Sequence, residues 1–168
     1  MLLTILKEAN KKVVGLHDDD ASSEAIMAML RHLYGLRYED QEIDVEGWHF
    51  PGLHLAVFTL GYKYDIESLR YEAAERFEDY LEGEIAEGTF YEETIHVIQK
   101  LLGPDVHQLA DQSLATSTRT FVLKHYDTLF ENDHFRNLMA SGTMLDIGLA
   151  HEFLNKIHKK QIEKKRRR

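Results

Sequence analysis

Three consecutive aspartates, Asp18 to Asp20, are the first residues of the sequence with a distinctive chemistry. Converging carboxylate oxygens bind Mg²⁺ or Ca²⁺, and a metal-dependent hydrolase would use such a site. Consecutive side chains point apart, however, and no EF-hand spacing follows the run. The run also precedes an apolar helical pattern, so we interpret Asp20 as a helix N-cap that contributes about 1 kcal/mol. We expect no metal and no cofactor, and the hydrolase stays the weaker alternative.

Ten histidines are the other candidate ligands or acid–base groups. No two of them have the His-Glu-x-x-His spacing that places two ligands on one helical face. The sequence also contains no Gly-x-Ser-x-Gly elbow, no phosphate-binding loop and no dinucleotide fingerprint. The chain has no cysteine, which excludes thiolate chemistry and disulfides. The sequence therefore predicts no catalytic residues and a protein that is not an enzyme.

The third feature is a basic C-terminal tail, residues 156–168, with eight Lys or Arg and one Glu. The tail carries a charge of +7. Because the net charge of the whole chain is −9, the residues before the tail carry −16. Because an acidic body repels nucleic acid and anionic membranes, such a contact must use the tail. Its charge is typical of a nuclear localisation signal or a nucleic-acid contact, and the alternative is a solubilising helix end. The candidates are Lys159, Lys160, Lys164, Lys165, Arg166, Arg167 and Arg168.

Composition places the chain among ordinary globular proteins. It has 168 residues, of which 43% are hydrophobic and 29% charged. No apolar run approaches the roughly 18 residues that cross a bilayer. The start, "MLLTILKEANKK", lacks the basic region and the small-residue cleavage site of a signal peptide. We expect a protein of the nucleus or cytoplasm.

Helical periodicity dominates the first half of the sequence. A stripe at helical spacing contains Ile26, Met29, Leu30, Leu33 and Tyr34, and Gly35 follows where the helix should stop. Two further stripes cover residues 53–64 and 66–81, with a break at Tyr64-Asp65. Only residues 11–16, "KKVVGL", have the β-branched character of a strand.

The second half reads as helical throughout. Thr89 and Glu92 have the spacing of a capping box, and Gly103-Pro104 is a strong helix stop. The remaining helix starts are expected at Asp105, at Asn132 or Asp133, and near Thr143, from which the last helix continues into the basic tail.

Two stretches, "VVGLHDDDASSEAIMAMLRHLYGLRY" and "LHLAVFTLGYKYDIESLRYEAAERF", together resemble the later half of a BTB/POZ domain of the fungal type. The sequence departs from that pattern at Phe58, where Tyr is usual, at Gly61, where Ala is usual, and at Ala21, where Pro is frequent. The matching residues are Leu30, Leu33, Tyr34, His54, Val57, Lys63, Tyr64, Ile66 and Leu69.

The resemblance implies a mainly α fold with three parts. Residues 1–82 would be the C-terminal half of an α/β BTB/POZ domain, with one residual strand and helical hairpins. Residues 83–155 would be an all-helical extension, and residues 156–168 the basic tail. The family's first strands and helices have no counterpart in this sequence. His54 matches a position that is structural in the family, so we interpret it as a packing residue.

The resemblance also implies protein partners, through homodimer or heterodimer surfaces or through a cullin. BTB/POZ proteins that recruit cullin ubiquitin ligases carry a hydrophobic-x-Glu motif, and Leu6-Lys7-Glu8 matches it. The alternative for this short pattern is a helix end with an ordinary surface Glu. The implied function is an adaptor for a ubiquitin ligase or a transcription complex, and a nuclear regulator that contacts nucleic acid through the tail is the alternative. Candidate partner-binding residues are Leu6, Glu8, Tyr34 and Tyr64.

Overall fold

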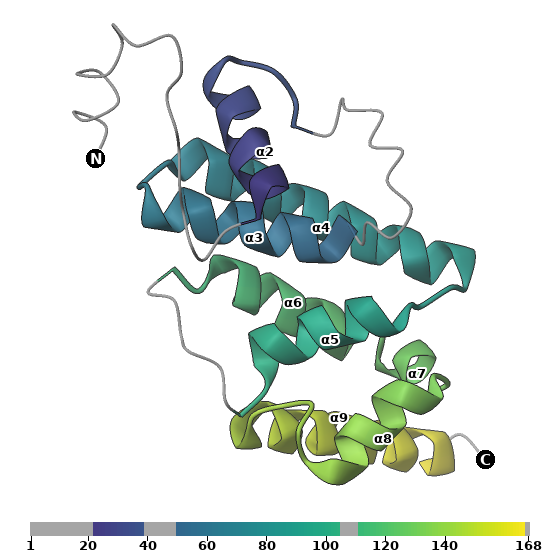
Figure 1. Ribbon diagram of the computed structural model, residues 1–168. Helices are drawn as coiled ribbons and strands as arrows, with labels where there is room; N and C mark the ends of the chain where they lie inside the picture. Colours follow the sequence, from purple (N-terminus) through teal and green to yellow (C-terminus); the bar gives the residue numbers. More distant parts are fainter. Residues whose placement is uncertain (1–21, 39–49, 105–110, 167–168) are drawn as a thin grey trace, which may run out of the picture.

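The computed structural model describes residues 22–38, 50–104 and 111–166 of the chain. All regular secondary structure within these residues is helical (Figure 1), so the prediction of a mainly α fold is confirmed. The strand predicted at residues 11–16 lies outside the described residues.

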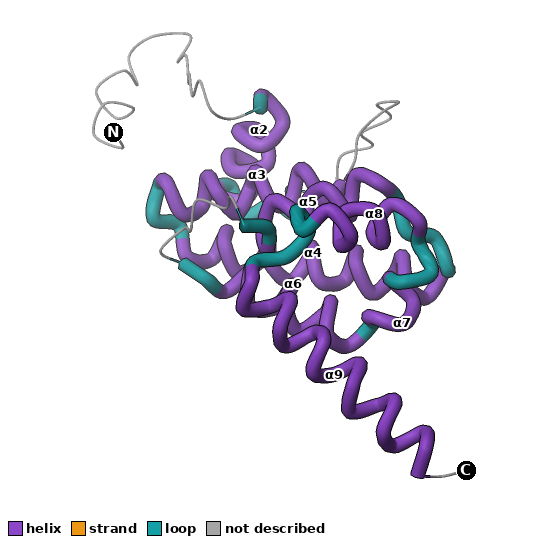
Figure 2. Tube along the Cα trace, turned by 90° about the horizontal axis from the view of Figure 1, so that it is seen from below, coloured by secondary structure: helices purple, strands orange, loops and turns teal. Residues whose placement is uncertain are grey.

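The described helices follow one another from one end of the molecule to the other. In Figures 1 and 2, α2 and α9 lie at opposite ends, and α3 to α6 lie between them. The helices are α2 (Ser23–Leu33), α3 (Phe50–Lys63), α4 (Glu67–Glu87), α5 (Glu92–Leu102), α6 (Ser113–Lys124), α7 (Tyr126–Leu129), α8 (Asp133–Ser141) and α9 (Ile147–Arg166).

α3 and α4 form a tightly packed hairpin at the centre of the fold. A Cβ atom added to Gly61 of α3 would lie 2.9 Å from Cγ and 3.1 Å from the backbone N of Arg70 in α4, so only glycine permits this approach. Asp65 has a positive φ of 54° in the turn between the two helices. The predicted break at Tyr64-Asp65 is therefore confirmed.

The N-terminal end of α2 is capped by Ser22, whose Oγ accepts a hydrogen bond of 3.2 Å from the backbone N–H of Ala25. The prediction that Asp20 is the N-cap is therefore wrong, because a hydroxyl closer to the first helical residue fills that role. At the other end, Gly35 has a φ of 73°, and the next N–H bonds back to Arg31. The predicted stop at Gly35 is confirmed.

The connection between α4 and α5 differs from the prediction. Gly88 takes a left-handed conformation with a φ of 69°, and the N–H of Thr89 donates to the carbonyl of Glu84 at 3.0 Å. Thr89 therefore completes the end of α4. α5 begins at Glu92 after Tyr91, which makes no side-chain cap. The capping box predicted for Thr89 and Glu92 is wrong.

The remaining helix ends agree with the prediction in two of three cases. α5 ends at Leu102 before Gly103-Pro104, and Asn132 Oδ1 accepts from the N–H of Phe135 at 3.1 Å as the cap of α8. α9 begins at Ile147 and not near Thr143, because the Thr143 N–H closes the end of α8. The predicted cap Asp105 lies outside the described residues.

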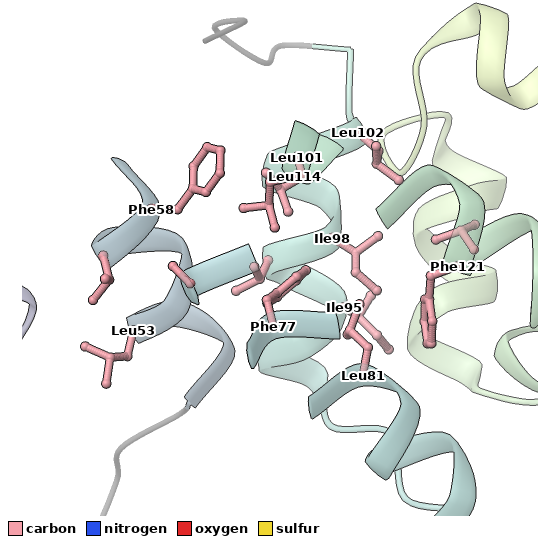
Figure 3. Close-up of a cluster of buried hydrophobic side chains, with 14 of the residues drawn as sticks. Leu53, Phe58, Phe77, Leu81, Ile95, Ile98, Leu101, Leu102, Leu114 and Phe121 are labelled. Atoms are coloured by element: carbon pink, nitrogen blue, oxygen red, sulfur yellow. The ribbon is translucent and has the colours of Figure 1, made fainter. Parts of the chain in front are cut away.

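One continuous hydrophobic core joins the helices from α2 to α9. Figure 3 shows Phe77 and Leu81 of α4 beside Ile95 and Ile98 of α5, all four fully buried. Each side chain of this size contributes about 1.5–3 kcal/mol when it leaves water. α9 joins the core through Phe153, whose ring centroid lies 5.7 Å from that of Tyr126. The core thus fixes where α2 and α9 can present side chains to solvent.

Candidate functional site

α2 packs its small side chains against the protein and turns several large ones toward solvent. Ala25 and Ala28, which face the body, are 0% and 4% exposed. Leu33 is 55% and Tyr34 82% exposed, and Met27 is 47% exposed. Because unexplained exposed apolar groups cluster at interaction sites, this arrangement makes α2 the first candidate site.

The apolar stripe predicted on α2 is therefore not a single core-facing surface. Only Met29 of its five residues is fully buried, while Ile26 and Leu30 are half-buried. Leu33 and Tyr34 are exposed, so the predicted helical stripe lies only partly in the core. The physical reason is that alanine side chains allow a closer approach to α3 than the larger residues would.

We define the α2 outer surface as Met27, Leu33, Tyr34 and Leu36, all large and all exposed. Leu36 follows Gly35 and is 52% exposed. One charged group lies next to this surface, since the guanidinium of Arg31 donates from Nε to the carbonyl of Arg37, the residue after Leu36, at 3.1 Å. An apolar centre with a charged edge is the usual anatomy of a protein–protein contact.

A polar link fixes the C-terminal end of α2 to α4. His32 Nδ1 lies 2.6 Å from Glu72 Oε2, and His32 Nε2 lies 2.8 Å from Ser68 Oγ. Both contacts join residues of α2 and α4 that are far apart in sequence. They orient the helix so that Tyr34, two residues after His32, remains at the surface.

The structure separates the two described candidates for partner binding. Tyr34 belongs to the α2 outer surface and is mostly exposed to solvent. Tyr64 is half-buried in the turn after α3 and packs against the core. Leu6 and Glu8 lie outside the described residues.

A buried polar pair joins Tyr38, which follows α2 in the sequence, to His54 of α3. The Tyr38 hydroxyl and His54 Nδ1 are 2.9 Å apart, and both residues are nearly inaccessible to solvent. Burial, together with the charge of Arg76, lowers the pKa of His54 to about 4. The interpretation of His54 as a packing residue is confirmed, since its imidazole is enclosed as a neutral group.

Glu84 is a second buried titratable residue that the sequence did not single out. It is 4% exposed, and its Oε1 accepts a hydrogen bond of 2.8 Å from Thr94 Oγ1. Burial raises the pKa of Glu84, and the hydrogen bond from Thr94 opposes that shift. Burial and the neighbouring Glu84 also raise the pKa of Tyr80. No exposed surface of Glu84 is available for a substrate, so we interpret this group as structural.

Two histidines from different helices are in contact on the surface. The ring centroids of His96 in α5 and His134 in α8 are 4.9 Å apart, and His134 Nδ1 lies 3.8 Å from Glu92 Oε1. Within the described ranges, no three His, Asp or Glu residues are arranged to hold a metal ion. Asp18–Asp20 lie outside those ranges.

A groove of about 490 Å³ opens between α3, α5, α6 and the start of α9. Two of its charged residues, Arg119 and Asp111, already have partners. Arg119 contacts Glu152 at 2.6 Å, and Asp111 contacts Arg70 at 3.0 Å. A charged ligand would have to break these pairs, so the groove is a weaker candidate than the α2 outer surface.

Five of the seven candidate nuclear-localisation residues belong to the C-terminal end of α9. Lys159 and Arg166 are exposed, whereas Arg167 and Arg168 lie outside the described residues. Lys160, Lys164 and Lys165 belong to the same helix. Along the described part of the chain, no helix has both the length and the apolar character to cross a bilayer.

Comparison with known proteins leaves the chain without an assigned relative. No protein-family model matches it, and the searches of curated proteins and of solved structures found no match.

Proposed function

We propose that the protein is a non-enzymatic protein-interaction module of the BTB/POZ type, with the α2 outer surface as its partner-binding site. The observation that carries this proposal is the orientation of α2. Its two alanines and Met29 face the protein, whereas several other large residues face solvent, which leaves Leu33 and Tyr34 exposed beside one another in the sequence.

The size of the exposed residues supports a binding role. Burial of one large apolar side chain contributes about 1.5–3 kcal/mol, so the four side chains of the α2 outer surface offer several kcal/mol before the costs of association. Tyr34 is the strongest single candidate, because tyrosine is enriched among residues whose truncation weakens binding by about 2 kcal/mol or more.

The BTB/POZ assignment within this proposal comes from the sequence resemblance. The order of α2, α3 and α4, with a sharp turn at Tyr64-Asp65, agrees with the helical pattern that the resemblance implies. We propose that the bound partner is a cullin or a component of a transcription complex, and that the protein acts as an adaptor. The residual strand at residues 11–16 and the motif Leu6-Lys7-Glu8 are part of the same proposal.

Direct binding to a cullin N-terminal domain tests the proposal. Isothermal titration calorimetry would compare the full chain with Tyr34→Ser and Glu8→Lys. We expect Tyr34→Ser to lower the affinity at least about tenfold, because it removes a large apolar contact. Tyr91→Ser is the matched control, because Tyr91 is also exposed, at 54%, but lies before α5.

The same samples would be examined for self-association by light scattering at several concentrations. A dimer that Tyr34→Ser dissociates and Tyr91→Ser preserves would also support the α2 outer surface as a binding site. A protein that stays monomeric and gives no binding heat with the cullin domain would refute the proposal. So would a Tyr34→Ser variant that binds like the native chain.

A further inference from the structure

The polar link between α2 and α4 has a chemical order as well as a structural role. His32 of α2 lies between two residues of α4, with its Nε2 2.8 Å from Ser68 Oγ and its Nδ1 2.6 Å from Glu72 Oε2. Ser68 and Glu72 are four residues apart, so they share one face of α4. A hydroxyl, an imidazole and a carboxylate therefore form one hydrogen-bonded chain.

The carboxylate of Glu72 determines which nitrogen of His32 carries the proton. An ionised carboxylate only accepts hydrogen bonds, so the proton of the neutral imidazole lies on Nδ1. Nε2 then has a free electron pair and accepts the hydroxyl hydrogen of Ser68. The same order of groups activates serine nucleophiles on unrelated folds, where it is recognised by geometry and not by sequence position.

The imidazole and the carboxylate are shielded from solvent, whereas the hydroxyl is accessible. The side chains of His32 and Glu72 are 16% and 21% exposed, and Ser68 is exposed. Shielding strengthens the contact between His32 and Glu72, which stabilises the imidazolium that forms when Ser68 loses its proton. A donor molecule in solution can reach Ser68 Oγ directly.

Ser68 also lies in the first turn of α4, where backbone N–H groups lack acceptors within the helix. Among the described residues of this turn, Ile66 at the N-cap makes no side-chain hydrogen bond. Negative charge is favoured at this end of a helix. In hydrolases with a serine at the start of a helix, the N–H of the next residue binds the oxyanion. Leu69 provides that N–H here.

We infer that Ser68 is a site of covalent acylation, with His32 as its base and Glu72 as the residue that positions His32. Ser68 Oγ bonds to the carbonyl carbon of an ester, and its proton passes to His32 Nε2. The bond from that carbon to the alcohol oxygen of the ester then breaks, and the departing oxygen takes the proton from His32. The products are acyl-Ser68 and the free alcohol.

Neighbouring side chains favour a neutral ester with an apolar acyl group. Tyr71 is 72% exposed and lies three residues after Ser68, so its ring can contact an apolar group bound there. Glu67 is exposed and precedes Ser68, so it repels anionic donors such as acyl phosphates. The reaction ends at acyl-Ser68, which makes it a modification of the protein that needs neither turnover nor the α2 outer surface.

Incubation of the full chain with p-nitrophenyl butyrate, a neutral activated ester, tests the inference. Absorbance of p-nitrophenol gives the rate, and tandem mass spectrometry of the digested protein locates the butyryl group. We expect a butyryl ester on Ser68 and its loss in Ser68→Ala. Ser23→Ala is the matched control and should react like the native chain. Ser23 is an exposed serine in the first turn of α2, and its side chain contacts Glu24.

Variants of His32 and Glu72 separate a reactive serine from a purely structural link. His32→Gln should slow acylation of Ser68 at least about 100-fold, because general-base catalysis contributes about 10²–10⁴-fold. Glu72→Gln preserves the size of the side chain and a hydrogen bond to His32. Its amide can donate to Nδ1, which moves the ring proton to Nε2, so we expect acylation at least about tenfold slower. Circular dichroism would verify that each variant retains its helix content.

Three results would overturn the inference. One is a native chain that carries no butyryl group on Ser68 after the reaction. Another is butyrylation of Ser23 as fast as that of Ser68, which would mean that exposure alone decides. The third is a folded His32→Gln or Glu72→Gln variant that is acylated at the native rate. If His32→Gln loses helix content, the rate of Glu72→Gln decides alone.

Discussion

The buried imidazole of His54 makes the stability of the protein depend on pH in a defined direction. An unfolded histidine binds a proton at a pKa of 6.5, whereas burial lowers the pKa of folded His54 to about 4. Between these two values, the unfolded chain binds more protons at this site than the folded protein does. Stability from His54 is therefore complete above pH 6.5 and is lost as the pH falls toward 4.

The size of the effect follows from the two pKa values. One unit corresponds to 1.36 kcal/mol, so the complete shift corresponds to about 3 kcal/mol below pH 4. Between pH 7.5 and pH 5.0 we expect a loss of about 2 kcal/mol in the free energy of unfolding. With a urea m-value of about 2 kcal/mol/M, the midpoint should fall by about 1 M.

Urea unfolding monitored by circular dichroism at pH 7.5 and pH 5.0 would measure this loss. His54→Gln cannot titrate, so its loss between the two values should be smaller than that of the native chain by about 2 kcal/mol. Tyr38→Phe removes the hydroxyl that lies 2.9 Å from His54 Nδ1 and keeps the imidazole, so it should retain the pH dependence. Equal losses in His54→Gln and the native chain would refute the reasoning.

Three further predictions concern single positions. Glu84→Gln should stabilise the protein by on the order of 1 kcal/mol at pH 7.5, because it removes a buried carboxylate whose pKa is raised. This gain should vanish near pH 4, where Glu84 is protonated in both the folded and the unfolded protein. Gly61→Val should lower the free energy of unfolding by about 1–3 kcal/mol in urea, since its Cβ would meet the backbone of Arg70. Asn132→Ala should lower the melting temperature by several degrees, because it removes a cap worth about 1 kcal/mol.

Local signals in the sequence predicted several parts of the fold. Gly35 ends α2 and Gly103-Pro104 ends α5, because these residues cannot continue a helix without cost. Asn132 caps α8 as expected. Each of these features depends on a few residues that are neighbours in the sequence, so it can be predicted from the sequence.

The face that α2 buries depends on tertiary structure instead. Periodicity identified an apolar stripe, but Ala25 and Ala28 form a second, smaller apolar face that packs more closely. Thr89 and Thr143 were likewise assigned to helix starts, whereas each donates its N–H to the helix that precedes it. The sequence identified Tyr34 as a candidate, although the contact between His32 and Glu72 that orients it joins distant residues.

The small buried face of α2 also sets how readily this helix opens. Two alanines and one methionine bury little area, so the free energy that holds α2 in place is modest, and the contacts of His32 supply much of its polar attachment. Amide hydrogens of α2 should therefore exchange with deuterium sooner than those of α4, which contributes Phe77 and Leu81 to the core. A ligand seated on the outside of α2 would slow that exchange, so deuterium uptake in this helix reports occupancy directly.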